Sequence, residues 1–329
     1  MVTTYKRREI EYPVIEGADE KLKEVCLIGI NERYSGNTKE KAEERLADEL
    51  AIIRQQGSAS GYLIVLDALK SVGYEPDDIC VRGTNASALV SYVAGLSNID
   101  PLGVVPYLYP EFYYGIDGNR HPSFEVNVEP DFLQRIIQHY DNYSGKEHLK
   151  HIYDDDDHIL GVFIGDFDES EITSPFCIGV FRILFIEAGN MRRAVSDFVS
   201  KEILDVCSPK TFADYVKCCG LEHGTGVWEG NAKTLIKDGK VSTDKVIADR
   251  EDVFELLIEH GIDKRAAFDI AEKTRKGRIC RAGWNLDTLE LLHSHEVPEW
   301  FIDSCRKIEY LFPRAHAMVY LKTYCNITP

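Results

Sequence analysis

The sequence is poor in basic residues. Its 329 residues include 38 lysines and arginines against 55 aspartates and glutamates, which leaves a formal net charge of −17. Proteins that bind phosphate backbones regardless of sequence carry an excess of Lys and Arg, because these side chains displace condensed counterions. The deficit therefore argues against nucleic-acid binding over the whole surface, and any such site has to be local.

Cys-x-x-Cys pairs of the zinc-binding type and long apolar runs are also missing, and no leader peptide is expected. The nine cysteines are scattered and no Cys-x-x-Cys occurs, which argues against a disulfide framework or a structural zinc site and for reduced thiols. The N-terminal stretch lacks the apolar core of a signal peptide, and the longest apolar segment, 177–189, is short and carries Arg182. We therefore expect a cytoplasmic protein without membrane contact.

What is present is a succession of short helical and extended patterns. Apolar residues recur at helical spacing over 19–33, 37–57 and 61–74. A short strand is expected at 77–83, with a helix directly after it at 84–96. The C-terminal part reads as a series of short helices separated by Gly, Ser, Asp or Pro.

These patterns predict an α+β fold in which a small mixed α/β part precedes a mostly α-helical domain. The polar, charged stretch around 138–158, with four consecutive aspartates, is typical of a linker. We expect four parts: an extended segment at 1–18, the α/β part at 19–140, an acidic linker at 141–158, and the helical domain at 159–329.

The stretch 121–130, HPSFEVNVEP, alternates as a strand does. One face carries Phe124, Val126 and Val128, and the other carries Ser123, Glu125 and Asn127. An acidic residue in mid-strand after a turn-rich segment is typical of metal-dependent enzymes. The alternative is an ordinary half-buried strand whose polar face is exposed to solvent. The pattern leaves both open for Glu125.

The segment CVRGTNASALVSY, 80–92, suits a phosphate group. A strand delivers Arg82 and Gly83, and a helix is expected to start at Thr84, so that backbone N–H groups and the Ser87 hydroxyl could receive the anion. The segment lacks the Gly-Lys-Ser/Thr of a Walker A sequence, and a plain capped helix is the alternative.

Two further stretches could contact a nucleotide. In LEHGTGVWEGNA, 221–232, glycines flank Thr225 and place His223 at the tip of a rigid loop, although a structural turn would look the same. In 304–322, cationic and aromatic side chains are interleaved, as in surfaces that stack on and neutralise nucleotides, although such aromatics also build cores.

The C-terminal region holds a local excess of positive charge. Residues 271–329 carry nine Lys/Arg against seven Asp/Glu, so this region is +2 while the remainder is −19. Its cations cluster in EKTRKGRICR, 272–281, where an anion could settle or a helix end could simply be solvated. His293 and His295 lie two apart on an expected helix, do not share a face, and predict no metal site.

Taken together, these stretches resemble the bacterial DNA polymerase III α subunit of the PolC type, a C-family replicative DNA polymerase. Residues 42–69 are similar to the start of that family's palm, and 82–102 to its phosphate-contacting Arg-Gly-Ser segment. Residues 208–236 and 297–320 are similar to its fingers. The resemblance covers about 20–130 and 150–325, and implies a palm-like part followed by a fingers-like domain.

The departures from the family matter as much as the matches. Where the family has Pro-Asp-Ile-Asp-x-Asn-Phe, with two aspartates that hold the catalytic magnesium ions, this sequence has Ser123 and Glu125. Two-metal catalysis and octahedral magnesium tolerate little change of ligand position. The family's third aspartate, its thumb and the second part of its palm have no counterpart between 130 and 152. Its phosphoesterase-like, exonuclease, clamp-binding and OB parts have none either.

The resemblance and the local patterns together assign phosphate or nucleotide binding to Arg82, Gly83, Thr84, Ser87, His223, Thr225, Lys276, Arg278, Arg306, Lys307, Arg314 and His316. A serine of the family's phosphate segment is Ala88 here. Glu125 is then a degenerate remnant of the catalytic site. We expect a catalytically inactive, replication-linked protein without cofactor that binds a dNTP, an NTP or a replication protein, and duplex DNA weakly or not at all.

Two other functions stay open. One is a minimal metal-dependent nucleotidyltransferase that needs magnesium and recruits substitute carboxylates, either Glu125 with Asp166 and Asp168 or the run 154–157. The other is an interaction scaffold that uses some of the 17 tyrosines, as in the segment YLYPEFYY at 107–114.

Overall fold

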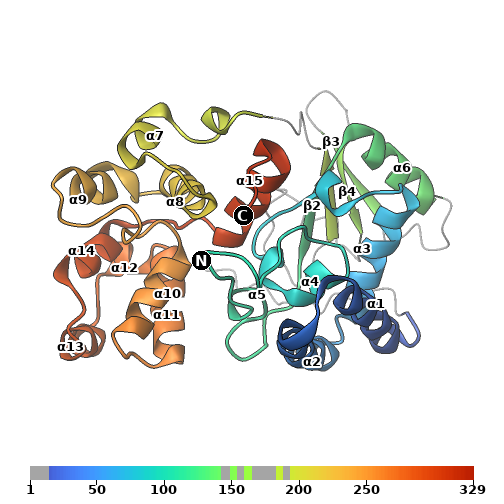
Figure 1. Cartoon of the computed structure of the whole chain (residues 1–329), viewed down its shortest axis with the longest axis horizontal. Coiled ribbons are helices and arrows are strands. Elements are labelled where there is room, and N and C mark those ends of the chain that lie inside the picture. The colour runs from blue at the N-terminus through green and yellow to red at the C-terminus, as the bar shows by residue number, and fades with distance from the viewer. Residues whose placement is uncertain (1–14, 142–148, 154–158, 165–182, 188–192) are drawn as a thin grey trace, which may run out of the picture. The chain divides into compact units, whose positions relative to one another are not determined.

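The structure is a computed structural model of the chain, and it describes residues 15–141, 149–153, 159–164, 183–187 and 193–329 (Figure 1). The chain divides into two compact units. Unit 1 comprises Met1–Gly103 and Tyr109–Met191, and unit 2 comprises Val104–Leu108 and Arg192–Pro329. Elements of both helix and strand type are present, which confirms the predicted α+β class.

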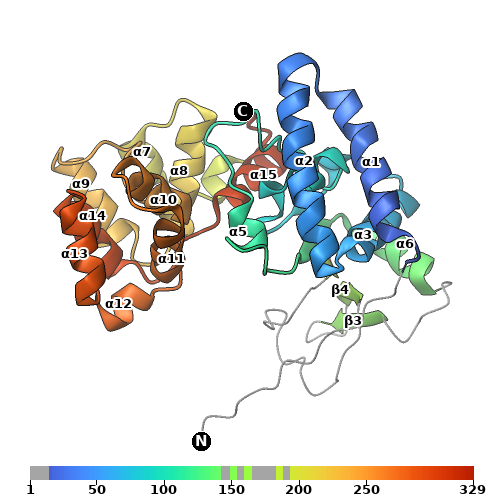
Figure 2. The ribbon, with the colours of Figure 1, turned by 90° about the horizontal axis from the view of Figure 1, so that it is seen from below.

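Unit 1 begins with three helices where the periodicity predicted them. They are α1 (Ala18–Arg33), α2 (Gly36–Gln56) and α3 (Ala59–Ser71). Gly57 ends α2 in the left-handed conformation, with φ 65°, which glycine adopts without a Cβ clash. Figure 2 shows α1 and α2 side by side, and Leu22, Cys26, Leu46 and Ile53 of this pair are buried in the core of the unit.

The sheet of unit 1 is mixed. Its strands are β1 (Cys80–Val81), β2 (Phe124–Val128), β3 (Leu149–Tyr153), β4 (Ile159–Ile164) and β5 (Ile183–Glu187), in the order β1-β2-β5-β4-β3. The β2–β5 pair is parallel, and the other pairs are antiparallel. The alternation predicted for β2 is confirmed, since Phe124, Val126 and Val128 are buried and the residues between them are half-buried.

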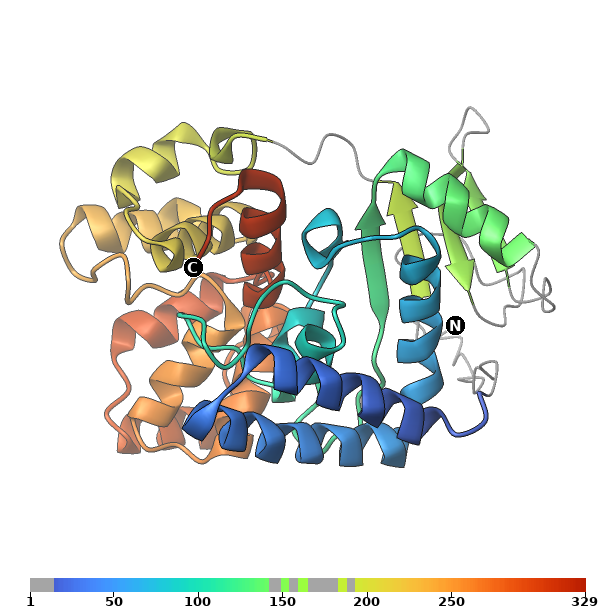
Figure 3. The same ribbon diagram turned by 45° about the vertical axis from the view of Figure 1, so that its right-hand side comes forward.

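The buried face of β2 packs against α3. The ring of Phe124 meets that of Tyr62 edge to face at 4.8 Å, and Figure 3 shows α3 running beside β2. Three shorter helices complete the unit: α4 (Leu89–Val93), α5 (Glu111–Tyr114) and α6 (Pro130–Asp141). The helix predicted at 84–96 therefore differs from the observed one, because a single 3₁₀ turn, Asn85–Ser87, precedes a short α4.

The division into units differs from the predicted linker at 141–158. That stretch contains β3, and the chain after it supplies β4 and β5 to the same sheet as β2, so unit 1 continues to Met191. The polar composition of 138–158 hid this strand because β3 lies at the edge of the sheet, where polar and charged residues are common. Strands of five or six residues also leave a weak local signal.

Unit 2 is built from helices, as the punctuated pattern predicted. They are α7 (Lys201–Cys207), α8 (Phe212–His223), α9 (Lys233–Lys237), α10 (Arg250–Glu259), α11 (Lys264–Arg275), α12 (Arg278–Ala282), α13 (Leu286–Ser294), α14 (Glu299–Lys307) and α15 (Arg314–Cys325). Side-chain caps set several starts: Thr211 accepts from the Asp214 N–H, and Asp249 accepts from the Asp252 N–H. Within the described part of the chain, no helix is long and apolar enough to span a bilayer.

Candidate nucleotide site and its surroundings

Glu125 lies in the middle of β2, between β1 and β5. Its carbonyl accepts a hydrogen bond from the Arg82 N–H at 2.7 Å, and its Cα partner on β5 is Leu184. The Arg82 Nη1 atom lies 3.9 Å from the Glu125 Oε2 atom, with side chains 30 % and 22 % exposed. The neighbours of Glu125 across the sheet are therefore an arginine and a leucine.

This arrangement does not fit a pair of magnesium ions. Two-metal sites need several carboxylates at neighbouring positions, whereas residues 183–186 of β5, opposite 124–127, are Ile-Leu-Phe-Ile. Ser123 is exposed and carries no charge. Within the described ranges, no group of three or more His, Cys, Asp or Glu side chains could hold a metal ion. The substitute carboxylates at 154–157, 166 and 168 lie outside the described residues.

The segment that follows Arg82 forms a surface turn. Arg82, Gly83 and Thr84 are half-exposed, and Gly83 has φ 74° with no atom within 4 Å of the position that a Cβ would occupy. The glycine is thus required by its left-handed backbone and not by close packing. Ser87 differs, because its hydroxyl is buried and has no hydrogen-bond partner in the part of the chain that the structure describes.

The first amides of α4 are already bound by the protein itself. Glu49 of α2 is buried, and its two carboxylate oxygens accept from the N–H groups of Leu89 and Val90, each at 3.0 Å. Arg45 pairs with the same carboxylate at 2.9 Å, and the Tyr114 hydroxyl donates to it at 3.3 Å. The N–H groups of Leu89 and Val90 at the observed start of α4 are therefore not available to a phosphate, because Glu49 accepts from both.

The sequence pattern did not predict that Glu49 binds the start of α4. In α2 it is one of many charged residues on an amphipathic helix, and its only local signal is an Arg45–Glu49 spacing of four. The residues that it caps lie forty positions further along the chain. Nothing in the local pattern distinguishes such a buried carboxylate from its solvated neighbours.

A cluster of three tyrosines, Tyr62, Tyr113 and Tyr114, lies next to the start of β2. The Tyr113 hydroxyl accepts from the Asn85 side chain at 2.8 Å and donates to the Ser123 carbonyl at 3.4 Å, and the hydroxyls of Tyr62 and Tyr114 lie 3.1 Å apart. Burial raises the pKa of all three phenols. Much of the segment 107–114 is therefore core, which weakens its use as an interaction surface.

Arg314, predicted to contact a nucleotide, lies buried at the start of α15. Its Nε atom donates to Asp249, its Nη1 atom to Glu255 and the Tyr107 carbonyl, and its Nη2 atom to Asp252 and Glu255, at 2.6–3.1 Å. A guanidinium has five N–H donors, and all five are used here. Arg314 is thus a structural ion-pair centre of unit 2 with no donor left for a ligand.

Other predicted residues meet along the α14–α15 connection. The Thr225 N–H donates to the Tyr310 carbonyl at 2.9 Å, and the Lys307 ammonium donates to the Gly230 carbonyl at 2.7 Å. The His223 ring lies 5.0 Å from that of Phe312, which stacks on buried His316 at 4.9 Å. Burial lowers the pKa of His223, which disfavours the protonated imidazole at this place.

The remaining predicted cations are largely compensated nearby. Lys276 pairs with Glu272 at 3.2 Å, and Arg306 pairs with Asp303 at 2.7 Å. Arg278 is exposed on α12. The structure therefore brings Arg82, Gly83 and Thr84 together in unit 1, and His223, Thr225 and Lys307 in unit 2.

Comparison with known proteins defines the relationship. Residues 20–154 match the family described as Bacterial DNA polymerase III alpha NTPase domain. The chain is 36 % identical over 189 residues to a PolC-type DNA polymerase III from Oceanobacillus iheyensis, which covers 56 % of this chain. It is 41 % identical over 131 residues to the one from Lactococcus lactis, and 36 % over 159 residues to the one from Staphylococcus aureus, covering 38 % and 47 % of this chain. Over these regions the chain is similar to PolC-type DNA polymerases III.

The similarity covers only part of this chain and a small part of each PolC polymerase. The matched regions amount to 12 %, 8 % and 11 % of the lengths of those three PolC polymerases. The matched range 20–154 contains the Arg82 segment and Glu125, so the residues predicted from the resemblance in unit 1 lie within the range that matches the polymerase III alpha family. Ser123 and Glu125 both lie in this range.

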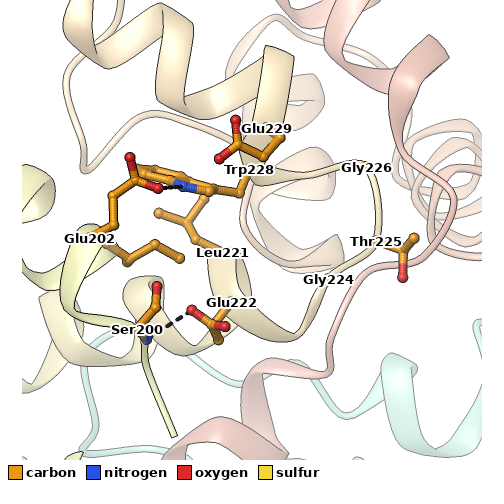
Figure 4. A pocket seen from close by; sticks show the side chains of 10 residues that line it. Ser200, Glu202, Leu221, Glu222, Gly224, Thr225, Gly226, Trp228 and Glu229 are labelled. Carbon is orange, nitrogen blue, oxygen red and sulfur yellow. Dashed lines mark hydrogen bonds between the residues drawn. The ribbon is translucent and has the colours of Figure 1, made fainter. Parts of the chain in front are cut away.

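The PolC-like chain also has a pocket of about 400 Å³ in unit 2, between α7, α8 and the loop after α8 (Figure 4). The Trp228 indole donates to Glu202 at 3.4 Å, and Lys233 pairs with both Glu202 and Glu229 at 2.7 Å. Glu222 accepts from the Ser200 N–H at 2.9 Å. Three glutamates on the wall disfavour a phosphate, although Thr225 of the predicted site lines this pocket.

Proposed function

We propose that this chain is a replication-linked binding protein that does not catalyse nucleotide addition, and that Arg82, Gly83 and Thr84 bind the phosphate of a nucleotide. One observation carries the proposal: Arg82 faces Glu125 at 3.9 Å where a PolC polymerase is expected to hold metal-binding aspartates. A guanidinium at this place favours a phosphate anion and disfavours a magnesium ion.

The contact between Arg82 and Glu125 is weak enough to be replaced. An ion pair this exposed contributes about 0.2–1 kcal/mol, whereas hydrogen bonds to a charged partner contribute about 1.5–3 kcal/mol. Arg82 can therefore turn from Glu125 to a phosphate with a net gain. The half-exposed turn at Gly83 and Thr84 leaves room for the anion beside it.

Thermal unfolding with a panel of dNTPs and NTPs, each with and without magnesium, tests the binding. A ligand at a hundredfold excess over its dissociation constant stabilises the folded chain by about 2.7 kcal/mol. We expect stabilisation that does not require magnesium. No stabilisation by any nucleotide would contradict the proposal and direct the search to a protein partner.

Templated primer extension with magnesium or manganese tests the lack of catalysis, and we expect no incorporation. Incorporation under either metal would contradict the proposal and favour a nucleotidyltransferase with substitute carboxylates. The variant Glu125→Gln adds a test of nucleotide binding. If Glu125 competes with the phosphate for Arg82, its loss should tighten binding about two- to fivefold. If Glu125 is still a metal ligand, its loss should weaken binding.

A further inference from the structure

Helices α13 and α14 of unit 2 are tied to one another at both ends of α13 (Figure 1, lower left). The His293 Nε2 atom, near the end of α13, lies 3.0 Å from the Glu299 carboxylate at the start of α14. The Trp284 indole, just before α13, donates to the Ile302 carbonyl of α14 at 3.2 Å. Leu292 and Ile302 are fully buried, so the inner side of the two helices belongs to the core of unit 2.

The outer side of α13 leaves apolar side chains in solvent. Leu286 is 76 % exposed, Leu289 is half-buried one turn later, and only Leu292 of this helix is fully buried. A single exposed leucine is common on protein surfaces. Here, however, Trp284, Leu286 and Leu289 fall within six residues, and all three keep contact with solvent. The start of α13 therefore presents an apolar face.

The surface of the same two helices is strongly acidic. Residues 282–305 contain five carboxylates and no lysine or arginine. All five carboxylate residues are exposed: Asp287, Glu290, Glu296, Glu299 and Asp303. Arg306 pairs with Asp303 at 2.7 Å, whereas Asp287 and Glu290 form no ion pair within the described part of the chain. Apolar and acidic groups that lie together favour a partner with apolar and basic groups, and the carboxylates disfavour anionic lipid and nucleic acid.

The partner that fits this surface is a helix. Apart from isolated bridges, the described part of unit 2 contains no strand, so it offers no sheet edge to which an extended segment could add. Helices pack by placing the side-chain ridges of one between those of the other, and Leu286 and Leu289 have the spacing of such a ridge. A basic amphipathic helix carries apolar residues at spacings of three and four with cations beside them, and so complements this surface.

We propose that the outer face of α13 and α14 binds a basic amphipathic helix of a partner protein. Apolar residues of that helix cover Leu286 and Leu289, and its lysines or arginines pair with Asp287 and Glu290. The charges speed association and lose strength as salt is added, whereas the apolar contacts hold the complex together. This surface lies wholly within unit 2, and the Arg82 turn belongs to unit 1.

The experiment measures binding of the full chain to a labelled peptide by fluorescence anisotropy. The peptide has about 18 residues, with leucines on one helical face and lysines on the other, which is long enough for a stable contact helix. We expect a dissociation constant of about 10–100 µM that weakens at least about fivefold from about 50 to about 300 mM salt. A scrambled peptide of the same composition should bind about tenfold more weakly. Equal binding of the two peptides would overturn the proposal, because charge alone would then explain it.

Variants locate the binding surface. Leu286→Ser removes the most exposed leucine and should weaken binding of the leucine–lysine peptide about tenfold. Glu290→Gln should weaken it about threefold and reduce its dependence on salt. The matched control is Ile28→Ser, at an apolar residue of α1 that is 59 % exposed, and it should leave the affinity unchanged. Unchanged binding in Leu286→Ser, or an equal loss in Ile28→Ser, would contradict the assignment.

A second copy of the chain is the other possible occupant. Analytical ultracentrifugation without peptide distinguishes the two, and the parent chain and Leu286→Ser should sediment alike. Self-association that Leu286→Ser abolishes would assign this surface to a contact between copies and overturn the proposal.

Discussion

The two units use arginine–carboxylate contacts in opposite ways. In unit 1, Arg82 and Glu125 meet at 3.9 Å at a partly exposed position. In unit 2, Arg314 is 1 % exposed and donates to three carboxylates and a carbonyl. Both arginines were predicted to bind a nucleotide. The comparison teaches that burial decides the role, because a fully paired buried guanidinium supports the fold while a loosely paired one is free to exchange partners.

Removal of Arg314 is expected to have the largest effect. Arg314→Ala leaves Asp249, Asp252 and Glu255 without their shared cation and should destabilise the chain by about 3–5 kcal/mol in urea unfolding. The matched control is Arg306→Ala, which loses only an exposed pair with Asp303 and should change stability by less than about 0.5 kcal/mol. Equal losses of stability in the two variants would contradict the conclusion that burial decides the role of an arginine.

Glu251 is a buried carboxyl group with fewer partners than the carboxylates around Arg314. It is fully buried, neither carboxylate oxygen has a hydrogen-bond partner among the described residues, and the Arg250 Nε atom lies 3.7 Å away. Burial raises its pKa to about 7, with Arg250 acting in the opposite direction. The folded chain therefore binds this proton more tightly than the unfolded chain, and stability is lost as pH rises from about 4.5 to about 7.

Glu251→Gln cannot ionise and should avoid that loss. Relative to the parent chain, the variant is expected to gain about 3 kcal/mol between pH 4.5 and pH 8, as 1.36 kcal/mol per pKa unit implies. Urea unfolding at several pH values measures the gain, with Glu259→Gln, an exposed glutamate at the end of α10, as control. A gain that does not depend on pH would contradict the assigned shift.

Glu49 gives unit 1 a buried carboxylate to compare with the network of Arg314. Glu49→Ala leaves the Leu89 and Val90 amides and Arg45 without their acceptor and should cost about 2–3 kcal/mol. Glu43→Ala, in the same helix with only an exposed pair to Lys39, is the matched control. A loss below about 1 kcal/mol for Glu49→Ala would mean that another acceptor takes over.

Arg82 should show the smallest effect on stability and the clearest effect on binding. Arg82→Ala is expected to change unfolding by less than about 0.5 kcal/mol, because its ion pair is partly exposed, while abolishing stabilisation by nucleotides. Arg54→Ala, an exposed arginine that pairs with Asp19 and Glu20, should keep the nucleotide response. Retained nucleotide stabilisation in Arg82→Ala would remove the basis of the proposed site.

Much of the local structure was predictable because it depends on short-range patterns. The spacing of apolar residues located α1, α2 and α3, and strict alternation located β2 with its correct buried face. The PolC resemblance singled out Arg82 and Glu125 separately, and the structure shows that their backbones are hydrogen-bonded to each other. The strand β3 was missed, because an edge strand with polar residues resembles a linker.

The sequence by itself determined α1 to α3, the helical character of unit 2, the strand β2, the acidic character of the chain and its similarity to PolC, since each depends on neighbouring residues or on runs of them. Only the tertiary structure decided that Glu49 occupies the start of α4, that Arg314 is buried among carboxylates, and that β5 lies beside Glu125 with a leucine opposite it. The physical reason is that the free energy of a charged side chain depends on its burial and on its partners. Apart from Arg45 and Tyr107, those partners lie 40 to 65 positions away in the chain.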